Sequence, residues 1–281
     1  MAERTLSVSG LRASFASSRH EPSLWTLEVD GTPQSQVDAH DPRTLHFEYV
    51  RRIGFALDTI GTPGAPITAV HLGAGALTLP RYVEATRPGS RQQVVEIEPE
   101  LIELVRSELP LPARANIRVR MGDARSVLGK LPSGLTGAVD AIVIDIFAGA
   151  QTPAHVTSRE FYAETVRLLA PGGLVLVNVA DGDRLAFARN QVATVRDLFP
   201  EVAAIANTTL LKGRRFGNVV IIAGRQPLPN AQLQRAIAGD MFPAKLVHGG
   251  ELDTFVSGAR IVRDTDAVDS PLPGRSIFIA R

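Results

Sequence analysis

Three consecutive apolar runs of the chain each end with residues suited to holding a polar ligand. ITAVHLG leads into Gly73-Ala74-Gly75, QQVVEIE contains Glu96, and NIRVRM precedes Gly122-Asp123. Glycines after a strand let backbone N–H groups approach a ligand. A carboxylate at a strand end can accept hydrogen bonds from ribose hydroxyls or from the exocyclic amine of adenine. Because ligands of open α/β sheets bind outside the carboxyl ends of the strands, the set predicts a nucleoside site.

Each of these features also has a purely structural explanation. A short glycine turn is often only a connection between a strand and a helix, and Asp123 is a good helix N-cap. Glu98 suits the first turn of the next helix, where the helix dipole favours an acid, so Glu96 is the better ligand candidate. The glycines fall short of the dinucleotide fingerprint Gly-x-Gly-x-x-Gly, because Thr78 stands at its third glycine. NAD is therefore a weaker hypothesis than a nucleoside.

A fourth apolar run, AIVID, ends in Asp145, which we expect on the floor of the same crevice. A carboxylate there loses solvation, so it either holds an amine substrate or another cation, or it pairs with a loop backbone. Partial burial would raise its pKa toward that of a useful proton acceptor. The following segment, residues 147–157, has a suitable length for a lid, and His155 within it is expected to be an exposed loop residue.

Other kinds of chemistry have no matching pattern. The chain has no cysteine, which excludes disulfides, thiolate metal sites and cysteine nucleophiles. Its six histidines are scattered and the Gly-x-Ser-x-Gly elbow of α/β-hydrolases is missing, so we expect no metal and no hydrolase. Lys212, Arg214 and Arg215 form a basic turn that could meet a phosphate but is better explained as a solvated hairpin loop.

The composition is that of an ordinary globular protein. Of 281 residues 44% are hydrophobic and 21% charged, and 30 basic against 29 acidic residues give a net charge of +1. A chain so close to neutral has no broad electrostatic field that would attract nucleic acid or a membrane surface. No apolar run approaches the roughly 18 residues that span a bilayer. Without a signal peptide or cysteine, the chain is expected to be soluble and cytoplasmic, with no nucleic-acid or membrane partner.

The elements that must position these residues alternate along the chain. From residue 66 onward, five apolar runs alternate with amphipathic stretches of helical periodicity, which predicts βαβ units and a doubly wound, mostly parallel sheet. A helix over 184–198 and two β-like runs, 202–208 and 217–223, bring the expected sheet to about seven strands. Residues 225–281 are rich in Pro and Gly and carry no pattern clear enough for an assignment.

The N-terminal segment has a different pattern. Residues 5–37 alternate apolar and polar side chains around the tight turn Asp30-Gly31, which predicts a small antiparallel sheet. Helical spacing then predicts a linking helix that starts at Asp41-Pro42 and ends near Gly61. We therefore expect residues 1–60 to form an N-terminal β domain with its linking helix. Residues 61–281 would form the nucleoside-binding catalytic core with a C-terminal extension.

The order of these motifs resembles the spermidine synthase family of polyamine aminopropyltransferases. LEVDGTPQSQ resembles the family's strand-turn-strand that ends in a ligand-binding Gln, and Asp41 through His46 echoes its acid-aromatic-His helix start. REFYAETVRLLAPGGLVLVN follows the family's Phe-Tyr helix and last core strand, so that the likeness covers about residues 24–180. It implies a class I methyltransferase-like Rossmann fold, a role in polyamine biosynthesis, and a homodimer or homotetramer.

The resemblance also implies roles for particular residues. Asp145 resembles the base that deprotonates the attacking amine, Glu96 the ribose-binding Glu and Asp123 the adenine-binding Asp. The amine substrate would contact His46 and Asp145. The cosubstrate, decarboxylated S-adenosylmethionine or S-adenosylmethionine itself, would be held by Gln34, Gly73, Gly75, Glu96, Gly122, Asp123 and Ala124.

Four positions depart from the family pattern at the amine end. Ala74 stands where the family Asp holds the aminopropyl amine, Leu45 and Phe47 replace a Tyr and a Glu beside the helix His, and Ala148 replaces the second Asp of the active-site loop. Each loss removes a polar contact to a diamine, and an unpaired ammonium group in a closed site is costly. Three functions stay open: aminopropyl transfer to an amine that need not be putrescine, methyl transfer from S-adenosylmethionine, and non-catalytic nucleoside binding.

Overall fold

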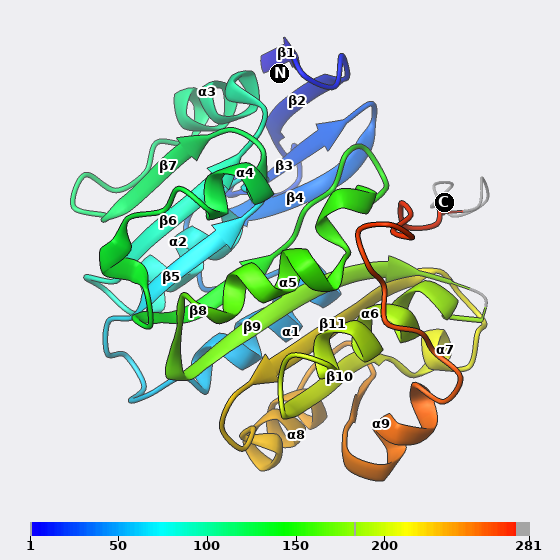
Figure 1. The fold of residues 1–281 in the computed structure, drawn as a ribbon. Helices are drawn as coiled ribbons and strands as arrows, with labels where there is room; N and C mark the ends of the chain where they lie inside the picture. Colours follow the sequence, from blue (N-terminus) through cyan, green and yellow to red (C-terminus); the bar gives the residue numbers. More distant parts are fainter. Residues whose placement is uncertain (1, 183, 274–281) are drawn as a thin grey trace.

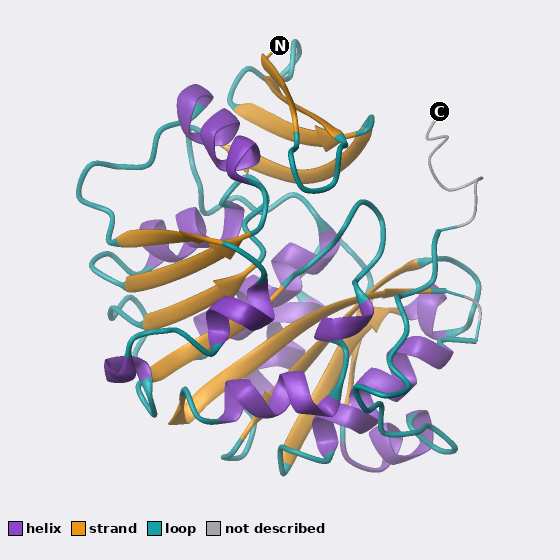
Figure 2. Cartoon of the chain, turned by 45° about the horizontal axis from the view of Figure 1, so that its top comes forward, coloured by secondary structure: helices purple, strands orange, loops and turns teal. Residues whose placement is uncertain are grey.

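The computed structural model describes residues 2–182 and 184–273, which form two β-sheets (Figure 1). One is a small antiparallel sheet of order β1-β2-β3-β4, and the other has eight strands in the order β12-β10-β11-β9-β8-β5-β6-β7. Helices cover both faces of the large sheet (Figure 2). The predicted α/β class with a small N-terminal antiparallel sheet is confirmed.

The small sheet follows the predicted alternation. On β2, Ala13 and Phe15 point inward and are fully buried, while their neighbours are at least partly exposed. The β3–β4 turn has positive φ at both Asp30 (47°) and Gly31 (72°), the geometry whose twist suits a two-residue hairpin. The strands are β1 (Ala2–Thr5), β2 (Arg12–Ser17), β3 (Leu24–Val29) and β4 (Thr32–Asp38).

Five strands of the large sheet pair in parallel, as the continuous apolar runs predict. Strand β5 lies between β6 and β8, so the winding direction reverses at β5. The five are β5 (Thr68–Leu72), β6 (Arg91–Glu96), β7 (Ile117–Met121), β8 (Val139–Ile144) and β9 (Leu169–Asp181). The helices between them are α2 (Thr78–Thr86), α3 (Pro99–Glu108), α4 (Ala124–Leu128), α5 (Arg159–Val166) and the 3₁₀ turns η1 (Ser133–Leu135) and η2 (Ala154–Val156).

The rest of the large sheet is antiparallel and contains a strand that the sequence did not indicate. Strand β12, only four residues long, pairs with β10 from within the unassigned C-terminal part, so the expected count of seven strands was wrong. Four residues are too few to display a period of two. The elements are α6 (Ala186–Arg196), β10 (Glu201–Asn207), α7 (Thr208–Leu211), β11 (Gly217–Gly224), α8 (Asn230–Ala238), β12 (Ala244–Val247) and α9 (Gly249–Phe255).

The linking helix α1 (Glu48–Asp58) begins later than expected. The Asp41 carboxylate accepts hydrogen bonds from the backbone N–H of Arg43 at 3.2 Å and from its guanidinium, and the Thr44 N–H bonds to the Asp41 carbonyl at 2.9 Å. This local turn replaces the first helical bonds, because a short acidic side chain competes for backbone N–H groups. The predicted start at Asp41-Pro42 was therefore wrong.

Apolar packing fixes both the small sheet and α1 beside the core. Phe15 and Leu27 of the small sheet share an apolar cluster with Ala74, after β5, and Leu101 of α3. Helix α1 packs instead in the cluster that holds Val143 of β8. A division of the chain at residue 60 stays a prediction. Among the described residues, no helix is long and apolar enough to cross a membrane.

Candidate active site

A cavity of about 330 Å³ lies at the carboxyl ends of β5, β6, β7 and β8, next to the small sheet. The strand ends contribute Gly73, Glu96, Gly122 and Asp145, and β4 contributes Gln34. The reversal of strand order at β5 is where ligands of open α/β sheets bind. The sequence thus identified residues that the fold brings together at one edge of the sheet.

Gly73 allows two strand ends to approach closely. It has φ of +92°, and a Cβ atom on it would lie 2.1 Å from the carbonyl oxygen of Asp145. The Asp145 N–H donates to the Leu72 carbonyl at 2.9 Å and continues the pairing of β5 with β8. Only glycine fits this position, and the turn it makes presents the Ala74 N–H to Glu96.

The Glu96 carboxylate is already oriented by the backbone. Its Oε2 accepts from the Ala74 N–H at 3.0 Å, and its Oε1 accepts from the N–H groups of Ile97 at 2.8 Å and Glu98 at 3.0 Å. Burial raises its pKa, and these hydrogen bonds oppose that shift. A carboxylate offers about four acceptor positions, so Glu96 retains capacity for a ligand hydroxyl.

Glu98 has a structural role, although not the one expected. It stands at the N-cap of α3, and its carboxylate accepts from the N–H groups of Val8 at 3.0 Å and Ser9 at 2.7 Å. Glu98 therefore anchors the turn between β1 and β2 instead of serving as the first-turn acid of its own helix.

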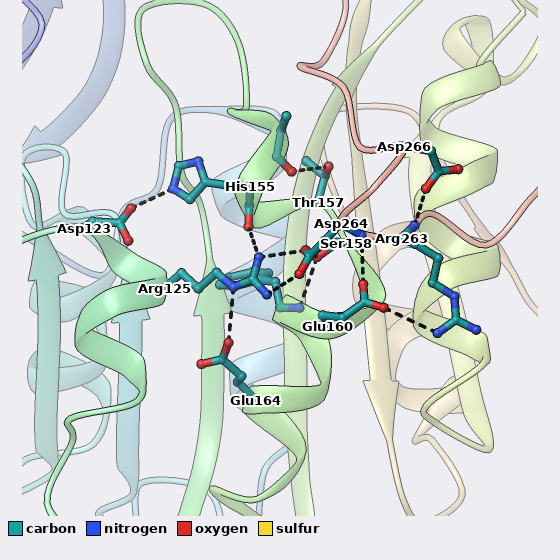
Figure 3. Close-up of polar contacts among 12 residues, drawn as sticks. Asp123, Arg125, His155, Thr157, Ser158, Glu160, Glu164, Arg263, Asp264 and Asp266 are labelled. Carbon is teal, nitrogen blue, oxygen red and sulfur yellow. Dashed lines mark hydrogen bonds and ion pairs between the residues drawn. The ribbon is translucent and has the colours of Figure 1, made fainter.

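Asp123 combines the two explanations that the sequence left open. Its Oδ1 accepts from the Ser126 N–H at 2.9 Å, so it caps α4, and it also lines the cavity. Its Oδ2 accepts from His155 Nε2 at 2.7 Å (Figure 3). Burial alone would raise the pKa of Asp123, but the hydrogen bonds from Ser126 and His155 outweigh it and hold the pKa below its usual value. His155 is half-exposed as expected, but its bond to Asp123 was not anticipated.

Asp145 is held by side chains and not by a loop backbone. Its Oδ1 accepts from Asn178 Nδ2 at 2.8 Å, and Asn178 Oδ1 accepts from Asn218 Nδ2 at 3.0 Å. The Tyr49 hydroxyl is its second hydrogen-bond donor. Burial raises the pKa of Asp145 to about 6, although the bonds from Asn178 and Tyr49 counter the shift. The sequence correctly indicated a desolvated acid with a raised pKa.

Tyr49 and Asn178 were not singled out from the sequence. Asn178 could have been, because it is a buried polar residue inside the apolar strand β9. Tyr49 could not, since one tyrosine near the start of an amphipathic helix carries no signal of its own. Burial and the nearby Asp145 raise the pKa of Tyr49 well above its usual value, so it stays a hydrogen-bond donor.

Only some of the residues expected at the amine end of the site line the cavity. His46 is not among the described residues that line the cavity, and its Nε2 atom is buried without a partner. Leu45 is buried against α1, while Ala148 does line the cavity. Neither Ala74 nor the neighbouring Ala76 has a polar side chain, so the turn after β5 offers a ligand only backbone groups there.

Acidic side chains predominate among the titratable groups around the cavity. Among the described residues that line it there is no Lys or Arg, and the carboxylates are Glu96, Glu98, Asp123 and Asp145. Burial lowers the pKa of His71 to about 4, so this lining histidine is neutral. The cavity therefore suits a cationic ligand.

Two further expectations concern metal and phosphate. Within the described ranges, no three His, Asp or Glu side chains are grouped as a metal ion would require. The basic turn lies outside the cavity lining, and there Arg215 pairs with Glu48 at 3.1 Å.

Comparison with known proteins finds polyamine aminopropyltransferases and, at 23% identity over 150 residues, the eEF1A lysine and N-terminal methyltransferase of Danio rerio, covering 51% of this chain and 22% of that protein. No family model matches the chain. It is 28% identical over 230 residues to the polyamine aminopropyltransferase of Vibrio vulnificus, covering 82% of this chain and 73% of the relative. It is also 28% identical over 197 residues to the polyamine aminopropyltransferase of Chromobacterium violaceum, covering 69% of this chain and 70% of that protein.

Solved structures agree with these relatives. A probable spermidine synthase from Corynebacterium glutamicum superposes with a TM-score of 0.84 at 28% identity, covering 100% of this chain and 99% of that one. A spermidine synthase in complex with the transition state analogue AdoDATO gives a TM-score of 0.59 at 13% identity, covering 92% and 83%. The second similarity concerns the fold alone.

Proposed function

We propose that this chain, a divergent member of the spermidine synthase family, transfers an aminopropyl group from decarboxylated S-adenosylmethionine to a small amine. One observation carries the proposal: Asp145, whose pKa burial raises to about 6, lies in the same cavity as Glu96 and Asp123. A carboxylate of that pKa is a useful base at neutral pH. Glu96 and Asp123 are acceptors of the kind that a nucleoside requires.

The nucleoside end of the cosubstrate is assigned to the strand ends of β5, β6 and β7. The acceptor capacity left on Glu96 suits ribose hydroxyls, and that left on Asp123 suits an exocyclic amine. Gly73 and Gly75 have positive φ and open the turn where the backbone would approach the ligand. The remaining residues assigned to this end are Gln34, Gly122 and Ala124, which line the same cavity.

The charge of the cavity supports a decarboxylated donor. Ordinary S-adenosylmethionine carries a carboxylate, which would lie among four acidic side chains with no Lys or Arg among the described lining residues. Losing that carboxylate leaves a sulfonium and an ammonium group, both of which an anionic cavity attracts. Aminopropyl transfer is therefore favoured over methyl transfer.

Asp145 has the role of general base. It accepts a proton from the ammonium form of the acceptor, and the freed nitrogen lone pair attacks the carbon next to the sulfonium sulfur. The new C–N bond forms as the C–S bond breaks, and its electrons remain on sulfur as a neutral thioether. Asn178 and Tyr49 hold the base in place, so that positioning supplies much of the rate.

The acceptor substrate that fits this cavity has one charged amine and an otherwise apolar body. Glu96, Glu98 and Asp123 each accept at least one backbone N–H, which leaves Asp145 as the carboxylate bound only by side chains. Tyr49 packs against an apolar cluster that includes Val50, Leu79 and Val143, which also line the cavity. A second ammonium group there would be unpaired at considerable cost.

Calorimetric titration with decarboxylated S-adenosylmethionine, S-adenosylmethionine and methylthioadenosine tests the nucleoside assignment. Binding of the first and third is expected, and absence of binding by all three would contradict the proposal. Product analysis with putrescine and with a monoamine of equal length then tests the reaction. We expect aminopropyl products, faster with the monoamine, and their loss in Asp145→Asn. Methyl products would instead favour a methyltransferase. Sedimentation would measure the homodimer or homotetramer that the family resemblance implies.

A further inference from the structure

The segment from Arg260 to Pro273, here called the C-terminal strap, crosses two helices of the core. The Arg159 N–H at the start of α5 donates to the Val262 carbonyl at 2.8 Å, and the Val262 N–H donates to Thr194 Oγ1 of α6 at 2.9 Å. Figure 1 shows the strap passing α6 and reaching the loop between β8 and α5. This part of the chain was unassigned from the sequence.

The strap holds the lid loop, residues 147–157, through Ser270. The Thr152 N–H donates to Ser270 Oγ at 2.9 Å, and the Ser270 N–H returns a bond to the Thr152 carbonyl at 3.0 Å. Ser270 is fully buried, and its carbonyl also accepts from the Gln151 side chain. Two residues further along the lid loop, the Ala154 N–H donates to Asp269 Oδ1 at 2.8 Å. The lid loop cannot shift without breaking these bonds.

A second link joins the strap to α4 (Figure 3). Arg125 makes a bidentate pair with Asp264, with Nη1 to Oδ1 and Nη2 to Oδ2 both at 2.8 Å. Its Nη1 also donates to the His155 carbonyl at 3.1 Å, and its Nε donates to Glu164 at 3.2 Å. The Ser158 hydroxyl donates to the same Asp264 carboxylate. One guanidinium thus connects the strap, the lid loop and the helix that Asp123 caps.

The lid loop in turn orients Asp123. His155 Nε2 donates to Asp123 Oδ2 at 2.7 Å, while Ser126 occupies Oδ1, so the direction of the carboxylate is fixed from both sides. Both Asp123 and His155 line the cavity. A polar group that binds a ligand is usually held by such a second layer of hydrogen bonds, because a rotating carboxylate would lose orientation entropy on binding.

We propose that the C-terminal strap positions the residues that bind the nucleoside end of the ligand. Asp264 acts through Arg125 as a positioning residue that holds His155, and His155 sets the direction in which the Asp123 carboxylate meets the nucleobase. The inference rests on the proposed function, because it needs a nucleoside bound at Asp123. It assigns a role in ligand binding to Asp264, which lies 139 positions after Arg125 in the chain.

The test is a double-mutant cycle on methylthioadenosine binding, measured by calorimetry with the full-length chain. Asp264→Asn and His155→Ala should each weaken binding by about tenfold, and the double variant should be hardly weaker than either one. Asp264→Glu, which keeps the charge, should recover part of the loss. The matched control is Asp253→Asn, because Asp253 also pairs with an arginine, Arg196, at 2.7 Å but is not linked to the lid loop.

Several results would overturn the inference. Wild-type affinity in Asp264→Asn, tighter binding in His155→Ala, or additive losses in the double variant would each do so. If Asp264→Asn does not fold, Ser270→Ala replaces it in the same cycle and must meet the same expectation. Failure of the proposed function looks different, since the wild-type chain would then not bind methylthioadenosine at all. A fall in thermal stability alone, with unchanged affinity, would also count against a positioning role.

Discussion

Replacing Asp145 with Asn should make the folded chain more stable at high pH while removing its activity. The side chains have nearly the same shape, and the Asn oxygen can still accept from Asn178. Burial raises the pKa of Asp145 from 3.8 to about 6. At about 1.4 kcal/mol per unit, such a shift corresponds to about 3 kcal/mol of destabilisation when the carboxylate is ionised in the folded state.

The direction of the pKa shift of Asp145 determines the pH range over which the stability changes. Since the folded-state pKa is raised, the stability associated with Asp145 is complete below pH 3.8 and is lost as the pH rises through about 6. Asn does not titrate. The difference in unfolding free energy between Asp145→Asn and the wild type should therefore grow in favour of the variant by about 1.5 kcal/mol between pH 5 and pH 8. Activity should fall by about 100-fold or more, as expected for loss of a general base.

Urea denaturation of both proteins at pH 5, 6, 7 and 8 measures this difference. Comparing the two at each pH cancels the titration of all other groups. Glu100→Gln is the control, because hydrogen bonds from its own backbone and from Ser7 hold the pKa of Glu100 below its usual value, so its difference from wild type should stay flat over this range. A difference for Asp145→Asn that is flat, or that shrinks as the pH rises, would refute the reasoning.

Three further predictions concern the same strand ends. Gly73→Ala should destabilise the fold by about 3 kcal/mol or more in urea, since its Cβ would lie 2.1 Å from a carbonyl oxygen. The control Gly89→Ala, with φ of +84° and open space, should lose only about 1 to 2 kcal/mol, and equal losses would contradict the clash. The pH profile of kcat/KM should rise to half its maximum near pH 6, the pKa of Asp145, and a midpoint below pH 5 would argue against this base. Tyr49→Phe should move that midpoint to higher pH, because the hydroxyl lowers the pKa of Asp145, and an unmoved midpoint would exclude the interaction.

The sequence predicted the strand ends because their signal is local. Apolar runs define the buried strands, and the polar residue that ends each run must lie at the edge of the sheet. The sequence alone therefore predicts that Gly73, Glu96, Asp123 and Asp145 lie together. The raised pKa of Asp145 followed from the same reasoning, since an acid after four apolar residues loses water.

Contacts between distant segments could not be predicted in this way. The hydrogen bond between His155 and Asp123 joins residues 32 apart, and the pair of Arg125 with Asp264 joins residues 139 apart. Neither interaction produces a periodic pattern in the sequence. Strand β12 was missed for a related reason, because a four-residue strand is recognisable only from its partner. The late start of α1 reflects a turn at Asp41, where a side chain competes with the helix for backbone N–H groups.

The bond between Glu98 and the first hairpin has a consequence for how the site opens. Glu98 lies two residues after Glu96, and its carboxylate holds the amide protons of Val8 and Ser9. Those two protons can exchange with solvent only when the hairpin turn leaves the end of β6. Their exchange rates thus measure how often this wall of the cavity, which Val8 and Ser9 help to line, separates from the end of β6, and a bound nucleoside should slow them.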